Sequence, residues 1–213
     1  MKTLHSNLTI WLLAATLSGT SLAACAQATT GTTAAAAPAD PAKSTLLQPM
    51  QQMVTKLKKL QATGDPDFDY ALQAKVHTQG GLDLMKQEVQ AGKDTSLKKM
   101  AQTLMAAAQN DVTMLDGTMK QIKPTRPNQA FTQQQSRNIE AINLKLQQTG
   151  SSDKLTGDID KNFAALLLDQ RQDAIDMANT YLQYGKNSTL RTYAEQMIAK
   201  AKQEMDQIKA LPK

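Results

Sequence analysis

Apolar side chains recur every three or four residues along two long stretches of the chain, the spacing that brings them to one face of an α-helix. The first stretch contains Leu97, Met100, Ala101, Leu104, Met105, Ala108, Val112 and Leu115, and the second contains Leu190, Tyr193, Ala194, Met197, Ile198, Ala201, Met205 and Ile208. A residue suited to capping a helix, Asp94 or Asn187, precedes each stretch. The pattern predicts two amphipathic helices that bury these apolar faces.

The two helices form part of an internal repeat, because residues 65–115 align with residues 158–208 without a gap, at an offset of 93 residues. Identical pairs include Asp67 and Asp160, Gln79 and Gln172, Asp83 and Asp176, Gly92 and Gly185, and Lys93 and Lys186. The two glycines follow predicted helices at 66–91 and 158–184, where a left-handed C′ glycine would end each helix. Each repeat is therefore predicted to form an αα-hairpin.

Two such hairpins can bury their apolar faces against each other as an antiparallel four-helix bundle. The predicted elements are repeat one at residues 65–122, a connecting helix at 128–149, repeat two at 158–211 and a further helix near 45–63. In the connection, Asn128 can cap the helix after two prolines, and Gly150 can end it. Residues 44–213 are thus predicted to be one all-α domain, a four-helix bundle with two accessory helices.

The first 24 residues are typical of a bacterial signal peptide. Lys2 supplies the positive charge, and residues 8–17 form an apolar run of about ten residues, which is too short to span a bilayer. The segment ends in Leu-Ala-Ala-Cys, which resembles a lipobox, so we predict cleavage before Cys25 and lipid attachment to it. The alternative is cleavage after Ala28, which would release a soluble periplasmic protein.

Residues 26–43 contain no large apolar side chain, so residues 25–43 are predicted to be a flexible, lipid-anchored tether. Ala26, rather than an aspartate, follows the cysteine, and the resemblance to bacterial lipoproteins then implies sorting to the outer membrane, facing the periplasm. The membrane is the expected partner, reached through the anchor, and the sequence specifies no protein partner.

Composition excludes several classes of protein. Only 4% of the residues are aromatic, which disfavours an all-β fold, and a net charge of +5 with few aromatic side chains disfavours nucleic-acid binding. One cysteine permits no disulfide within a monomer. The chain lacks the Glu-x-x-His pairs of di-iron bundle enzymes, a nucleophile elbow and a phosphate-binding glycine loop after a strand. We therefore predict a protein that is not an enzyme.

The second repeat contains the segments Asp160-Lys-Asn-Phe163, Ala174-Ile-Asp-Met-Ala178 and Gln203-Glu-Met205. These segments resemble the ferritin-like family numbered 305 among the domains of unknown function, and the resemblance covers both hairpins. It implies a ferritin-like bundle and two adjacent histidines ahead of the Ala-Ile-Asp-Met-Ala segment. It also implies a link to copper, because some members are associated with copper handling in the bacterial envelope.

The positions of those histidines are occupied by His77 and Thr78 in repeat one, and by Gln170 and Arg171 in repeat two. Three of the four imidazoles that the resemblance implies are therefore absent. The helical spacing directs His77 toward the bundle interior.

Two interpretations of His77 follow. In the first, it is one ligand of a metal site that has fewer histidines than the family's, completed by the thioethers of Met85 and Met114, because Cu(I) accepts imidazole and thioether together. In the second, it is a metal-free histidine that is hydrogen-bonded within the core. Most of the other methionines occupy the apolar stripes as gap fillers. Those expected off the main stripes, and so free to coordinate a metal, are Met50, Met53, Met114 and Met119.

Arg171 is expected at or beside a buried face, where an unpaired guanidinium would be costly. Glu204 is the predicted partner, and we hypothesise that this ion pair replaces the charge of a metal in the second repeat. The alternative is an arginine that extends to solvent. The sequence thus leaves two functions open: an envelope copper-binding protein, or a metal-free helical structural or interaction module.

Overall fold

The computed structural model describes residues 40–123 and 125–211, and within these residues the chain forms six α-helices and no strand. The helices are α1 (Pro41–Lys59), α2 (Pro66–Ala91), α3 (Thr95–Met119), α4 (Gln129–Ser151), α5 (Ile159–Tyr184) and α6 (Ser188–Lys209). Each begins after an aspartate or asparagine whose side chain accepts a backbone N–H of the first turn. The predicted caps Asp94, Asn128 and Asn187 are confirmed.

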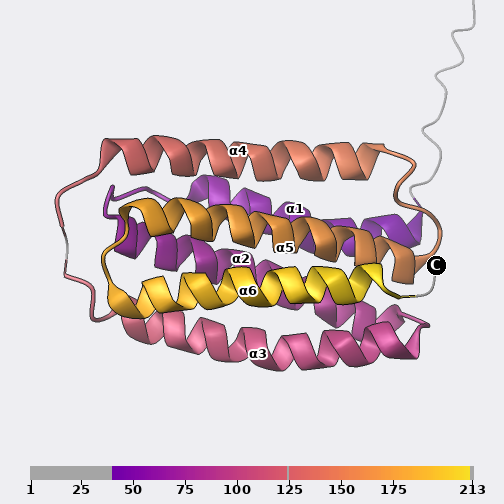
Figure 1. Ribbon diagram of the computed structural model, residues 1–213. Helices are drawn as coiled ribbons and strands as arrows, with labels where there is room; N and C mark the ends of the chain where they lie inside the picture. Colours follow the sequence, from indigo (N-terminus) through magenta and orange to yellow (C-terminus); the bar gives the residue numbers. More distant parts are fainter. Residues whose placement is uncertain (1–39, 124, 212–213) are drawn as a thin grey trace, which may run out of the picture. The chain divides into compact units, whose positions relative to one another are not determined.

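The all-α prediction is confirmed, and the two repeats form the hairpins α2–α3 and α5–α6. The first helices of the hairpins, α2 and α5, pack against each other, while α1 packs on α2, α4 and α5. Figure 1 shows all six helices running along a common axis, with α4 and α3 at the two outer edges of the view. One end of the bundle carries the connections α1–α2, α3–α4 and α5–α6, and the opposite end carries α2–α3 and α4–α5.

In each hairpin, the connection between the two helices is held by an aspartate of the other hairpin. The carboxylate of Asp67, at the start of α2, accepts the backbone N–H groups of Lys186 and Asn187 at 2.8 and 3.0 Å. Its repeat counterpart Asp160, at the start of α5, accepts the N–H groups of Lys93 and Asp94 at 2.8 and 2.9 Å. The repeat detected in the sequence is therefore an approximate two-fold symmetry of the structure.

Gly92 and Gly185 end α2 and α5 as expected, but not by the expected mechanism. Their φ values are −62° and −72°, so neither adopts the left-handed conformation of a C′ glycine. A Cβ at Gly185 would lie 1.9 Å from the ring of Tyr181, and one at Gly92 would lie 2.3 Å from the carboxylate of Glu88. Glycine is needed here because a buried side chain from the preceding turn passes beneath it.

Three boundaries also differ from the predictions, and one is the end of α1 at Lys59 rather than near residue 63. α1 begins at Pro41 rather than near residue 45, because Asp40 caps it and proline suits the first helical position, so the last residues of the predicted tether are helical. α4 continues through Gly150 to Ser151, because a single glycine weakens a helix without ending it. None of the helices in residues 40–123 and 125–211 is long and apolar enough to cross a membrane.

Candidate functional site

A cavity of about 40 Å³ lies between α2, α3, α5 and α6. Its polar lining consists of Tyr70, His77, Thr78, Asp111, Gln170, Arg171, Tyr193, Lys200 and Glu204. Its apolar lining consists of Ala74, Met85, Leu104, Ala107, Ala108, Ala174, Met177 and Met197. Ala107 and Lys200 are exposed on the surface of the bundle, so the cavity opens to solvent between α3 and α6.

His77 and Gln170 meet inside this cavity, although they are 93 residues apart and occupy equivalent positions in the two repeats. Both are buried, with exposed fractions of 3% and 1%. The distance from Gln170 Nε2 to His77 Nδ1 is 3.2 Å. The positions at which the resemblance implies histidines are thus in contact across the α2–α5 interface.

The side chain of Arg171 fixes which atom of the Gln170 amide faces the imidazole. Its NH1 group donates to Gln170 Oε1 at 2.6 Å, and a guanidinium can only donate. The amide N–H₂ must therefore face His77 and donate to Nδ1. Since Nδ1 of a neutral imidazole then accepts, the ring proton lies on Nε2.

His77 remains neutral in this setting. Burial, together with the positive charges of Arg171 and Lys145, lowers the pKa of the imidazole to about 3. Within the described part of the chain, no group is hydrogen-bonded to His77 Nε2. The cavity therefore contains a buried, unpaired N–H donor fixed by its neighbours.

Arg171 and Glu204 form an ion pair between α5 and α6, the two residues that the sequence analysis placed together. The side chain of Arg171 is 9% exposed and that of Glu204 is 18% exposed, so the pair lies at the edge of the buried region. Asp111, the repeat counterpart of Glu204, lines the same cavity, and burial raises the pKa of its carboxyl group. The hypothesis that the pair replaces a metal's charge remains a hypothesis.

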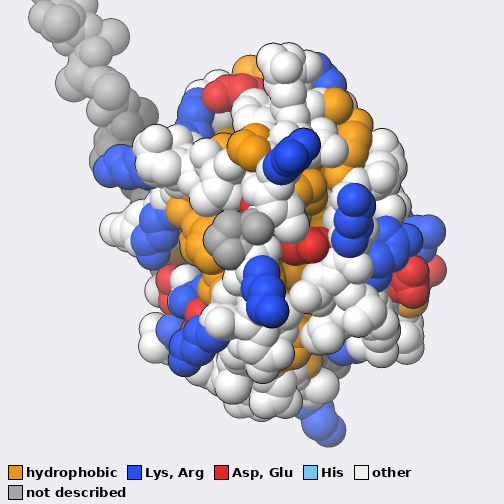
Figure 2. Space-filling view, turned by 90° about the vertical axis from the view of Figure 1, so that its left-hand side faces the viewer, with side chains coloured by type: hydrophobic (Ala, Val, Ile, Leu, Met, Phe, Trp, Pro, Cys, Tyr) orange, Lys and Arg blue, Asp and Glu red, His pale blue; other side chains and the backbone are white. Residues whose placement is uncertain are grey.

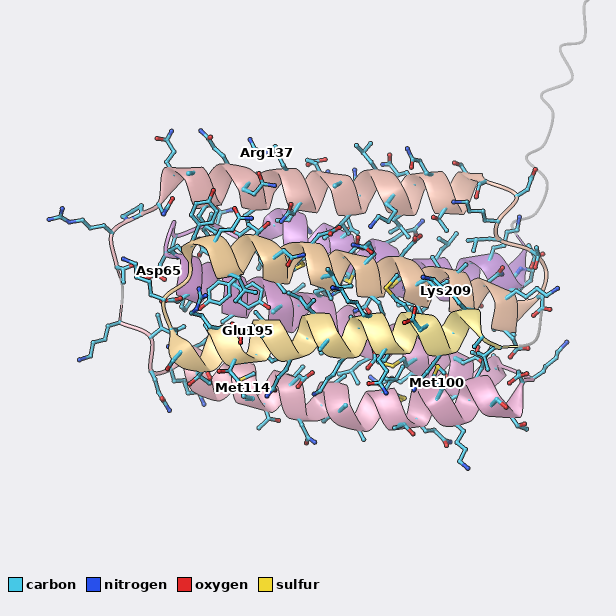
Figure 3. The ribbon with its side chains drawn as sticks, in the orientation of Figure 1. Asp65, Met100, Met114, Arg137, Glu195 and Lys209 are labelled. Atoms are coloured by element: carbon cyan, nitrogen blue, oxygen red, sulfur yellow. The ribbon has the colours of Figure 1, made fainter. Side chains whose placement is uncertain are left out.

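The structure does not bring together the three residues proposed as metal ligands. Met85 lines the cavity with His77, but it lies eight residues further along α2, which is a rise of about 12 Å. Met114 lies outside that lining, near the C-terminal end of α3, where it borders a separate open pocket beside the start of α6. In Figure 3, Met114 and Met100 are well separated along α3.

Of the four methionines expected off the apolar stripes, Met50 and Met53 lie in the core instead, with exposed fractions of 2% and 1%. Met53 faces α2, where a Cβ at Gly80 would lie 2.5 Å from its side chain. Met114 and Met119 are half-buried. Cys25, the predicted site of lipid attachment, lies outside the described residues.

The hydrogen bonding of His77 differs from that of a usual histidine ligand of a metal. A histidine ligand needs a free lone pair on the coordinating nitrogen and normally donates its other N–H to an acceptor, whereas Gln170 presents a donor to Nδ1 of His77. Within residues 40–123 and 125–211, no group of three or more His, Cys, Asp or Glu side chains is arranged to hold a metal.

Residues 67–212 match the family described as "Domain of unknown function (DUF305)". The chain belongs to this family. The match begins at Asp67 and covers both hairpins with the connecting helix, and so includes the whole cavity. No curated protein and no solved structure matches the chain. Membership of the DUF305 family thus confirms the resemblance, and its description adds no activity.

One polar arrangement near the cavity was missed by sequence reasoning. The ring of Tyr70 stacks on Tyr181 at 4.1 Å between centroids, and the Tyr181 hydroxyl donates to Asp67 at 2.7 Å. The repeat counterpart of Tyr181 is Glu88, whose carboxyl group lies near that of Asp160, the counterpart of Asp67. The 93-residue offset pairs Tyr181 with Glu88, but a tyrosine and a glutamate are too dissimilar for the sequence to indicate that they occupy equivalent places.

Proposed function

We propose that this chain is a non-catalytic envelope lipoprotein of the DUF305 family, whose helical domain serves as a metal-free interaction module. The absence of enzyme motifs from the sequence supports the non-catalytic role. The leader-like first 24 residues and the lipobox-like position of Cys25 support an anchor in the outer membrane, facing the periplasm.

The observation that carries the metal-free role is the hydrogen-bonded chain from Arg171 through Gln170 to His77. For Nε2 to bind a metal, the ring proton would have to move to Nδ1, where it would face the amide N–H₂ of Gln170. Rotating the amide would instead turn its N–H₂ toward the guanidinium. Either change leaves two buried donors facing each other. Each donor that loses its acceptor lowers the stability of that arrangement by about 1–3 kcal/mol.

Copper binding is the second candidate function, and one observation favours it. Besides Met85, the thioethers of Met177 and Met197 line the cavity that contains His77. Cu(I) is a soft ion that binds thioether and imidazole ligands. The two candidates differ in whether His77 Nε2 carries a proton in the free protein.

Titration of the mature protein with Cu(I) against a competing chelator distinguishes the two functions. We expect wild type and His77→Ala to compete equally weakly with the chelator for Cu(I). In wild type, ¹⁵N NMR should place the imidazole proton of His77 on Nε2. As a matched variant, Gln170→Glu places an acceptor opposite Nδ1 and is expected to move the proton there. Cu(I) binding that is at least about tenfold tighter in wild type than in His77→Ala would establish copper binding instead.

Lipid attachment is tested separately. We expect cells expressing the full chain with radiolabelled palmitate to incorporate label into the mature protein, and Cys25→Ser to abolish incorporation, because acylation requires that thiol. Partition into detergent phase should fall in parallel. An unlabelled mature protein that begins at Thr29 would show cleavage after Ala28 and a soluble periplasmic product.

A further inference from the structure

Basic side chains gather at the end of the bundle that carries the α1–α2, α3–α4 and α5–α6 connections. They are Lys56, Lys58, Lys59, Lys120, Lys123, Arg126 and Lys186, and all seven are exposed. We call this set the basic end. Figure 2 views the molecule from this side and shows lysine and arginine side chains distributed around the face.

The aspartates of the basic end are hydrogen-bonded within the protein, and one of them, Asp116, pairs with Lys75 at 2.6 Å. Asp69 accepts the backbone N–H groups of Thr63 and Gly64 at 2.9 and 2.8 Å. Asp65 is 3% exposed and caps α2, while Asp67 accepts the N–H groups of the α5–α6 connection. These three carboxylates are bonded to backbone N–H groups, and none forms an ion pair with a lysine of the basic end.

The longest connection at the basic end is fastened to the bundle on both sides of Arg126. The carboxylate of Asp65 accepts both the N–H and the hydroxyl of Thr125 at 2.7 Å. The N–H of Asn128 donates to the carbonyl oxygen of Gly64 at 2.8 Å. Arg126 therefore extends from a backbone that is hydrogen-bonded to the bundle on both sides.

The opposite end of the bundle differs in charge. Its exposed side chains include both signs, among them Asp94, Asp153 and Asp158 with Lys93, Lys154 and Lys209. Helix α1 also begins there, so the chain enters the domain at the end away from the basic end. The charge asymmetry runs along the long axis of the bundle.

The chemistry of the basic end indicates the kind of surface it fits. Six of its seven cations are lysines, which act as hydrated point charges on flexible stems, whereas arginine predominates where phosphates are held in fixed bidentate geometry. Among the described residues, a carboxylate lies within 4 Å of only one of the seven cations, Lys58. An array of unpaired lysines suits a fluid surface of mobile anions.

We propose that the basic end docks on a membrane surface rich in anionic phospholipid. This inference rests on the proposed interaction role for its biological setting, but it involves different side chains from the His77 cavity and from Cys25. A failed lipid-binding experiment therefore leaves the metal-free and lipid-attachment proposals standing, and their failure leaves this one standing.

The test measures binding of the chain from residue 26 onward, which lacks the proposed acylation site, to vesicles with and without phosphatidylglycerol. We expect binding only to the anionic vesicles, with loss at high salt because the attraction is screened. The triple variant K120E/K123E/R126E should bind at least about 100-fold more weakly, since each attractive charge near such a surface contributes about fivefold.

The matched control reverses three exposed lysines at the opposite end, K93E/K154E/K209E, and produces a similar change in net charge. We expect it to weaken binding by less than about threefold, because those charges lie more than a Debye length from the bound surface. The second variant K56E/K59E/K186E tests the same face from other elements if the first folds poorly. Equal losses at both ends, or binding to soluble polyphosphate but not to vesicles, would overturn the proposal.

Discussion

Replacing Gly185 by alanine is expected to lower the free energy of unfolding by about 3 kcal/mol or more. The new Cβ would lie 1.9 to 2.5 Å from three ring atoms of Tyr181. That ring has little freedom to move, because it stacks on Tyr70 and its hydroxyl is bonded to Asp67. The φ value of −72° is compatible with alanine, so the expected loss arises from the steric conflict alone. Urea unfolding followed by circular dichroism would measure it.

Gly117 provides the matched control for this substitution. It lies within α3, and a Cβ added there would meet no atom within 4 Å. Gly117→Ala is expected to raise the free energy of unfolding by about 0.5–1 kcal/mol, because alanine restricts the unfolded chain and favours helix. A Gly185→Ala protein as stable as Gly117→Ala would show that the Tyr181 ring can be displaced at little cost.

Raising the pH from 6.5 to 8 is expected to destabilise the protein by about 2 kcal/mol through Glu88 alone. Burial of this carboxyl, with the neighbouring carboxylates of Asp160 and Asp94, raises its pKa to about 8. The folded state therefore keeps a proton that the unfolded state releases above pH 4.5. The stabilisation is fully present below pH 4.5 and is lost as the pH rises through 8.

The window from pH 6.5 to 8 isolates Glu88 from the other buried groups with shifted pKa values. The imidazole of His77 has a pKa of about 3 when folded and of 6.5 when unfolded, so between pH 6.5 and 8 it adds only about 0.4 kcal/mol, of the opposite sign. Burial raises the pKa of Asp173 only to about 6. The pKa values of Tyr70, Tyr181 and Tyr193 are raised above 10, again by burial. Stability in this range should therefore follow one carboxyl group.

Glu88→Gln is the control for the pH effect. Glutamine has nearly the same shape and can donate an N–H to Asp160 without carrying a titratable proton. We expect its unfolding free energy to be nearly constant between pH 6.5 and 8, measured by urea denaturation at each pH. If the wild type is equally insensitive to pH, then Glu88 is ionised in the folded protein.

The helical framework could be predicted from the sequence because its signals are local or repeated. Capping residues such as Asp94 and Asn187 act within one helical turn, and the apolar stripes after them need only the helical period. The periodicity failed for Met50 and Met53, which it left outside the core, because α1 is covered by several neighbours and buries a wide face.

The candidate site was predicted only in part, because its chemistry depends on contacts between elements. Pairing Arg171 with Glu204 required only that a buried cation find a carboxylate on the facing helix. The proton position on His77 depends on two residues of another helix, and helical spacing carries no information on which way an amide points. The sequence indicated that Gly185 ends a helix. It did not indicate that glycine is needed there because the ring of Tyr181, four residues earlier, leaves no room for a Cβ.

Because Asp67 and Asp160 each bind the connection of the opposite hairpin, neither hairpin alone contains the carboxylate that holds its own connection. A shorter chain with one such hairpin would obtain the missing carboxylate from a second copy, as a homodimer with a true two-fold axis. In that dimer, position 77 would face its own copy, so the two residues in contact would be identical. A histidine that accepts from a glutamine across the axis requires two different halves, and joining the halves in one chain allows them to diverge.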